Sequence, residues 1–244
     1  LRGLTSAMSI TVLFLSCTLV DSATLSAWDV EGVDLDSESS PGIDATPADT
    51  DYTFTAGKMA SNIQDAKLTL SSAVNSSTAS DEYGFKIDSG SETASLGAAI
   101  TADHYMQFTI KSADGYVMNL TELEMTGEST STGADGVAIL TDIDDFSDGN
   151  EIASVTGVSG ETGGFDTDSS GFGAPIDLTG NQYQGISSIA FRIYGWNTSG
   201  TRGATSFRNP VDPDLAINGE VTSAPEPSTF FLLLSSGALF TTCG

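Results

Sequence analysis

The chain has 244 residues, with 33 acidic against 8 basic side chains and a formal net charge of −25 at pH 7. This charge disfavours nucleic acid and anionic membrane surfaces as partners, because both repel an acidic protein. An acidic surface can serve solubility alone, and it can also supply oxygen ligands for a divalent cation, so composition leaves both interpretations open.

The N-terminal segment has the layout of a secretory signal peptide. Arg2 is the sole charge before Asp21, an apolar stretch runs from Met8 to Val20, and the small residues Ser22 and Ala23 follow. A basic start, an apolar centre and a small-residue cleavage site together form the pattern of an export signal. We therefore expect the chain to be exported and cleaved after Ser22.

Removal of the signal peptide, residues 1–22, would leave a thiol-free domain of residues 23–222. Both cysteines, Cys17 and Cys243, lie in the terminal segments outside this domain. The domain therefore has no disulfide, no cysteine metal site and no cysteine nucleophile. Its length suits one domain, because a single hydrophobic core can serve about 200 residues.

Apolar residues alternate with polar ones in several short stretches, as they do in half-buried strands. In residues 105–111, for example, Met106, Phe108 and Ile110 share one face. Turn sequences rich in Gly, Asp and Asn separate these stretches. We therefore expect an all-β fold, an antiparallel two-sheet β-sandwich of the jelly-roll type. The predicted strands are 24–31, 68–70, 105–111, 115–126, 137–139, 189–196 and 215–221, and the predicted surface loop is 34–51.

The residues that could carry catalysis are few. Histidine occurs once, at His104, which excludes a multi-histidine metal centre, and no G-x-S-x-G motif accompanies it. We expect His104 to be an exposed or half-exposed loop residue. Glu122 and Glu124 share one strand face, but the Glu-x-Asp-x-x-Glu pattern of laminarinase-like sandwich enzymes lacks its two later acids here. We expect no enzymatic activity, and keep glycoside hydrolysis as an alternative.

The acidic loop of residues 142–151 is the local candidate for Ca²⁺ binding. Asp142, Asp144, Asp145 and Asp148 could supply carboxylate oxygens, which Ca²⁺ prefers as ligands. The spacing is not that of an EF-hand, because Phe146 occupies a ligand position. The loop is either a structural Ca²⁺ site or a polar hairpin connection, and no other cofactor is expected.

Aromatic residues in the predicted strand 189–196 indicate a ligand surface. Arg192, Tyr194 and Trp196 lie opposite the apolar face of this strand. A guanidinium beside two aromatic rings could stack on sugars, which would make the protein a carbohydrate-binding module for exopolysaccharide. The alternative is that Tyr194 and Trp196 complete the hydrophobic core, where aromatic side chains are common. Trp28 is expected in the core.

Pro225, Glu226 and Pro227 precede an uncharged apolar run, residues 230–240. The two prolines keep this triplet extended and outside any sheet, where a processing enzyme can reach it. A Pro-Glu-Pro triplet before a C-terminal apolar segment resembles the PEP-CTERM sorting signal of Gram-negative exosortase systems. Members of that family close on an arginine cluster that this sequence does not contain, so we expect residues 223–244 to be a truncated sorting segment.

Two interior blocks are also similar to PEP-CTERM proteins, namely residues 105–123 and the closing strands 191–196 and 215–221. The resemblance implies a jelly-roll protein exported to the outer surface or extracellular matrix of a Gram-negative-type bacterium and processed by an exosortase-like enzyme. It implies membrane contact through the terminal segments alone, and it transfers no catalytic residue. The expected function is therefore a structural surface or matrix protein, with exopolysaccharide as a candidate partner.

Overall fold

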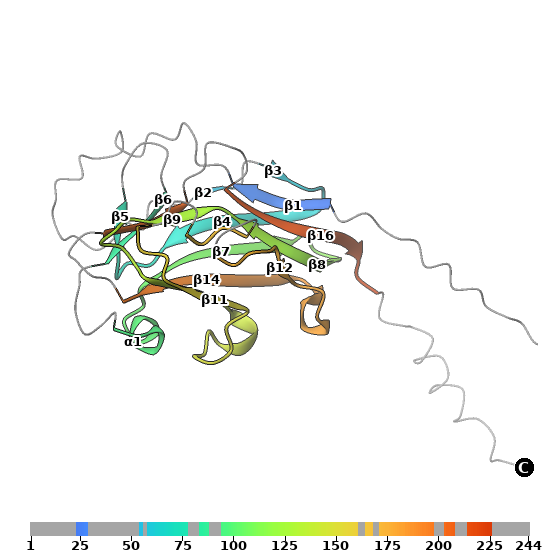
Figure 1. Cartoon of the computed structure of the whole chain (residues 1–244). Coiled ribbons are helices and arrows are strands. Elements are labelled where there is room, and N and C mark those ends of the chain that lie inside the picture. Colours follow the sequence, from blue (N-terminus) through green and yellow to red (C-terminus); the bar gives the residue numbers. More distant parts are fainter. Residues whose placement is uncertain are drawn as a thin grey trace, which may run out of the picture.

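The computed structural model is mostly β, with two main antiparallel sheets arranged as in a sandwich (Figure 1). The expected antiparallel two-sheet fold is thereby confirmed. The predicted signal peptide, the loop 34–51 and the apolar run 230–240 lie outside the part of the chain that the structure describes. That part comprises residues 23–28, 54–55, 58–77, 83–87, 94–160, 164–167, 171–197, 203–207 and 214–225.

The first of the two sheets, sheet A, brings the two ends of the described chain together. β1 (Ala23–Trp28) pairs with β16 (Leu215–Ser223), and β8 (Tyr116–Met125) pairs with the other side of β16. The remaining strands of sheet A are short: β12 (Ile176–Asp177) and β13 (Gln184–Ile186) pair with β8, and β3 (Lys58–Met59) pairs with β1.

The second sheet, sheet B, has the order β11-β10-β14-β7-β4-β2. Its centre is the pair of long strands that the alternating sequences predict, β7 (Tyr105–Ser112) and β14 (Ser188–Trp196). Phe191 lies opposite Phe108 in their antiparallel register. The other strands are β2 (Phe54–Thr55), β4 (Ile63–Leu70), β10 (Gly136–Thr141) and β11 (Ala153–Thr156).

A third, smaller sheet extends the fold beyond the predicted strands. Sheet C has the order β5-β6-β15-β9, formed by β5 (Asn75–Ser77), β6 (Tyr83–Ile87), β15 (Gly203–Phe207) and β9 (Gly127–Ser129). Three short helical elements complete the described chain: α1 (Leu96–Thr101), η3 (Asp142–Asp144) and η4 (Asn181–Tyr183). The helix α1 begins at Ser95, whose hydroxyl accepts a hydrogen bond from the Ala98 N–H at 3.2 Å.

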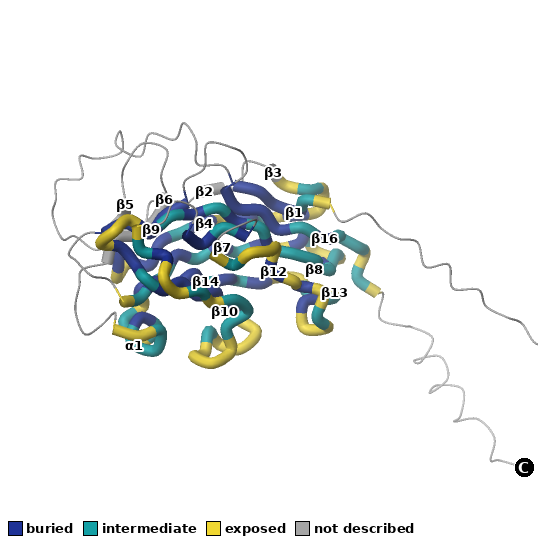
Figure 2. Tube along the Cα trace, viewed as in Figure 1, coloured by how far each residue is buried: buried dark blue, intermediate teal, exposed yellow. Residues whose placement is uncertain are grey.

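The hydrophobic core lies between sheets A and B and combines buried side chains of both sheets. Figure 2 shows the buried stretches of these strands in dark blue. Met106, Phe108 and Ile110 are fully buried, as their alternation predicts. The ring of Phe108 stacks on that of Phe191 with centroids 4.7 Å apart and meets that of Trp28 edge-on at 6.0 Å. The ring of Trp28 thus links sheet A to sheet B, and its expected core position is confirmed.

The first strand begins and the last strand ends at the same end of sheet A. Ala23, the first described residue, lies opposite Gly219 in the pairing of β1 with β16. After β16, the Ala224 N–H donates to the carbonyl of Gly115 at 2.8 Å, and Pro225, the next residue, is exposed. The segments that precede β1 and follow β16 therefore join the domain at neighbouring positions (Figure 1).

Candidate functional site

Two glutamates form a compact polar group on the outer face of sheet A. Glu122 and Glu124 alternate with the buried Leu123 and Met125 along β8, so they point away from the core. Asn218 lies opposite Glu122 on β16. Its side-chain amide nitrogen donates to Oε1 of Glu122 and to Oε1 of Glu124, each at 2.9 Å. One amide thus holds two carboxyl groups together.

This arrangement changes the proton affinity of Glu124. Partial burial, the charge of Glu122 and a hydrogen bond with Glu122 raise the pKa of Glu124 above its usual value, and the Asn218 amide opposes them. The Glu124 carboxyl therefore holds its proton to a higher pH than a free glutamate does. Glycosidase carboxyls stand about 5 Å or more apart on either side of the sugar bond. Here the Asn218 amide bonds to both carboxyl groups.

Replacing Glu124 by glutamine should stabilise the fold at pH 7. The pKa of this carboxyl in the folded state is raised above 4.5, its value in the unfolded chain. The ionised carboxylate therefore lowers the free energy of unfolding fully above the folded pKa, and this loss is absent well below pH 4.5. Because the side chain is partly exposed, we expect a gain of roughly 0.5 kcal/mol at pH 7 that disappears toward pH 3. Urea unfolding at both pH values measures it.

A charge-matched control for this prediction is Glu220→Gln, which removes one carboxylate from β16 on the same face of sheet A. This control measures how much the free energy of unfolding rises when an acidic protein loses any one negative charge. A gain at pH 7 that is no larger for Glu124→Gln than for Glu220→Gln would contradict the raised pKa of Glu124.

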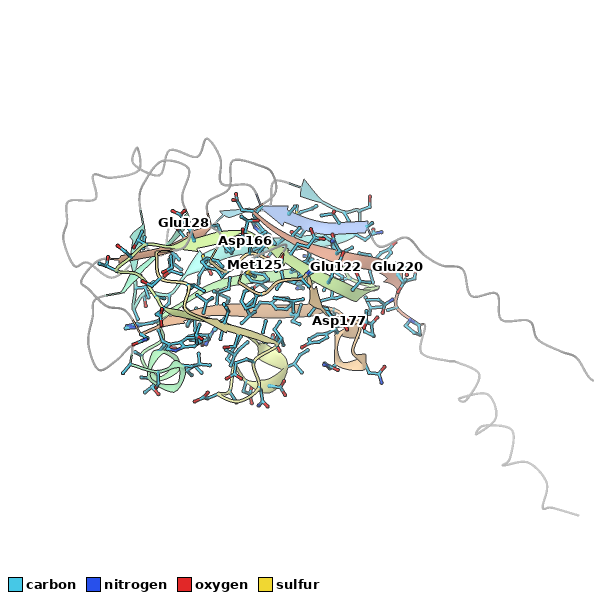
Figure 3. All side chains as sticks on the ribbon, viewed as in Figure 1. Glu122, Met125, Glu128, Asp166, Asp177 and Glu220 are labelled. Carbon is cyan, nitrogen blue, oxygen red and sulfur yellow. The ribbon has the colours of Figure 1, made fainter. Side chains whose placement is uncertain are left out.

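The outer face of sheet A is acidic beyond this pair. Asp177 on β12 lies opposite Glu122, and Glu220 lies farther along β16 (Figure 3). Hydrogen bonds from the hydroxyl and the N–H of Thr179, at 2.7 and 2.8 Å, hold the pKa of Asp177 below its usual range. No three His, Cys, Asp or Glu side chains of the described residues are placed to hold a metal ion.

The acidic loop proposed for Ca²⁺ directs its carboxylates to different places. Asp142 Oδ1 accepts the Ala190 N–H at 3.1 Å and so caps the edge of β14, while Asp148 approaches Gly97 of α1. Asp144 lies in η3, and Asp145 adopts a left-handed backbone with φ of 53°. The four aspartates therefore form no preassembled ligand set in this structure.

The predicted sugar-stacking residues are part of a second apolar cluster, on the outer face of sheet B. Tyr194 is 0% exposed, so its ring presents no surface to a ligand. Burial raises the pKa of its hydroxyl. Trp196 is half-buried and packs over Gly136, where an added Cβ would lie 2.2 Å from the indole. The cluster combines Ala99, Ala138, Leu140 and Tyr194 with Leu96, Ile100, Tyr105, Phe146 and Trp196.

Arg192 lies at the border of this cluster between two aromatic rings. Its guanidinium carbon is 3.9 Å from the ring centroid of Tyr105 and 3.9 Å from that of Phe146. Its Nε donates to Gln107 Oε1 at 2.9 Å and one terminal nitrogen donates to the Tyr194 hydroxyl at 3.3 Å. Phe146 was not predicted at this site, and its loop gives no sequence signal for the contact.

Two further predicted positions can now be placed. His104 lies in the connection between α1 and β7, as expected for a loop residue, but it is 9% exposed, so the expected exposure is wrong. Its N–H bonds to the Ala99 carbonyl at 3.0 Å. The cause is α1, which the sequence did not predict. In the sorting triplet, Pro225 is exposed, whereas Glu226 and Pro227 lie outside the described residues.

Comparison with known proteins gives no match to a family model, to a curated protein or to a solved structure. Within the described residues, every helix is too short to span a bilayer.

Proposed function

We propose that this protein is an exported, non-enzymatic β-sandwich of jelly-roll type that acts at the cell surface or in the extracellular matrix of a Gram-negative-type bacterium. An exosortase-like enzyme would recognise the triplet Pro225-Glu226-Pro227. The terminal segments, residues 1–22 and the part of 223–244 that follows Ala224, would make the membrane contacts during export and sorting.

The observation that carries this proposal is the position of the sequence signals next to the first and the last described strands of sheet A. The predicted cleavage after Ser22 falls directly before β1, which starts at Ala23. At the other end, Ala224 makes the last described backbone hydrogen bond to the domain and exposed Pro225 follows it. Processing at either border would therefore leave the two sheets whole, as a sorting system requires of its cargo.

Replacing Pro225 and Pro227 by alanine should abolish C-terminal processing of the full chain. The prolines keep the triplet extended and free of sheet pairing, which a protease needs in order to bind it. We expect the processed form to fall by about tenfold or more, the factor that corresponds to about 1.4 kcal/mol of lost recognition. Expression with and without an exosortase-like enzyme, followed by fractionation and mass spectrometry of the C-terminus, measures this.

The matched control is the double variant Ser228→Ala/Thr229→Ala, which changes two neighbouring residues and leaves the triplet intact. It should be processed and located like the unaltered chain. Processing that does not depend on the triplet, or a chain that stays in the cytosol when the enzyme is present, would contradict the proposal.

A further inference from the structure

The basic residues whose side chains the structure describes, Lys67, Lys111 and Arg192, all project from the outer face of sheet B. Lys67 lies opposite Thr109 in the pairing of β4 with β7. Arg192 lies opposite Gln107 in the pairing of β14 with β7. Opposed residues of an antiparallel pair point to the same side, and on each strand the intervening residues are buried in the core. The three cations therefore share one surface.

Arg192 has no carboxylate partner among the described residues of this acidic protein. Its guanidinium is held instead by the rings of Tyr105 and Phe146 and by neutral partners, Gln107 and Tyr194. A guanidinium fixed in this way loses little side-chain entropy when an anion binds, and it can bind a carboxylate through two parallel hydrogen bonds. Arg192 is thus preorganised for an anion.

The residues around Arg192 continue this surface as a polar strip across three strands. Lys111 lies opposite Ser188, four residues from Arg192 along β14, which places it about 13 Å away along the strand direction. Lys67 is two strands across from β14 and about 12 Å from Arg192. Gln107 and Thr109 lie between the cations, and the Gln107 amide donates to the Thr109 hydroxyl at 3.5 Å.

Acidic groups on this strip are few. Of the outward side chains of β4, β7 and β14, Asp65 carries the one carboxylate, and it is paired with Lys67 at 3.1 Å. The neighbouring segments contribute Asp142, which accepts the Ala190 N–H beside β14, and Asp103, whose charge acts on the Tyr194 hydroxyl next to Arg192. The outer face of sheet A, by contrast, carries Glu122, Glu124, Glu220 and Asp177.

We propose that the strip formed by Arg192, Lys67 and Lys111 binds an acidic polysaccharide, with uronate carboxylates on the cations and sugar hydroxyls on Gln107 and Thr109. Spaced cations suit a polymer with spaced carboxylates. A nucleic acid carries denser charge and meets stronger repulsion from a protein with a net charge of −25. The inference deepens the proposed matrix function and rests on it for its biological setting.

The test is binding of the purified full chain to polygalacturonate at low salt, with the methyl-esterified polymer as the uncharged comparison. We expect binding to the acid form alone, lost near 1 M salt, where the screening length falls to about 3 Å. The double variant Lys67→Ala/Lys111→Ala should weaken binding by about tenfold, as expected for two exposed charge contacts. Its melting temperature should stay unchanged, because Lys67 is 51% exposed and Lys111 is exposed.

The charge-matched control is Lys58→Ala/Lys86→Ala, which removes two lysines from β3 of sheet A and β6 of sheet C. It should bind polygalacturonate like the unaltered chain. Equal binding of the two double variants, equal binding of the esterified polymer, or tighter binding of dextran sulfate or duplex DNA would overturn the proposal. If the chain is exported but does not bind polygalacturonate, the binding proposal fails and the proposed function stands. If the chain binds polygalacturonate but is not exported, the proposed function fails and the binding proposal stands.

Discussion

Replacing Trp28 by alanine should lower the free energy of unfolding by about 4 kcal/mol. Trp28 is 0% exposed and its ring lies edge-on to Phe108, so the indole fills space between sheets A and B. Removing it leaves a cavity that surrounding side chains from two rigid sheets cannot close. Its neighbour on β16, Leu215, would lose contact as well. Urea unfolding followed by circular dichroism measures the loss.

The matched control for this prediction is Trp28→Phe, which keeps a ring and removes the indole nitrogen. Trp28 Nε1 is buried without a hydrogen-bond partner among the described residues. An unpaired buried donor costs about 1–3 kcal/mol, so its removal offsets part of the lost packing. We expect Trp28→Phe to cost about 1 kcal/mol. Equal costs for the two substitutions would show that the indole nitrogen is bonded, and would contradict this account.

The long strands of the sandwich could be predicted because one side of each faces the core and the other does not. β7, the first part of β14 and the middle of β16 show alternation for this reason. β15 shows none, because all five of its residues, Gly203–Phe207, are buried. The Thr205 hydroxyl can be buried because it accepts a hydrogen bond from the Ala134 N–H at 3.1 Å, and hydropathy cannot predict such a bond.

For the candidate site on sheet B, the sequence predicts the strand that carries the residues but not the segments that pack over them. The period-two pattern placed Arg192, Tyr194 and Trp196 correctly on the face opposite Ile189. Their burial depends on α1 and on Phe146, which reaches Arg192 through a long-range contact from a turn. That turn requires left-handed backbone at Asp145 and Phe146. A bulky residue such as Phe rarely adopts this conformation, so the sequence does not predict the turn.

The aspartates of the loop are dispersed for a related reason. The run Asp142 to Asp148 contains four aspartates in seven residues of sequence, yet the η3 turn and the two left-handed residues after it point their side chains in different directions. One carboxylate caps the β14 edge and another approaches α1. Acid density in a loop therefore says little about coordination until the backbone path is known.

Replacing Arg192 by alanine should lower the free energy of unfolding by about 2–4 kcal/mol. The change removes two cation–π contacts, to Tyr105 and Phe146, each worth about 1 kcal/mol when partly desolvated. It also leaves Gln107 Oε1 and the buried Tyr194 hydroxyl without their guanidinium donor. Arg192→Lys keeps the charge and loses the planar stack, so it should recover less than half of the loss. Urea unfolding of the three proteins measures both effects.

The turn at Phe146 provides the control that separates stacking from backbone strain. Phe146 has φ of 53°, a conformation that costs a residue with a Cβ about 1 kcal/mol and glycine almost nothing. Phe146→Ala and Phe146→Gly both remove the ring over Arg192, so the glycine variant should be about 1 kcal/mol more stable than the alanine variant. In a double-mutant cycle, Arg192→Ala and Phe146→Ala should couple by about 1 kcal/mol. Additive losses would mean that the ring and the guanidinium stabilise the loop independently.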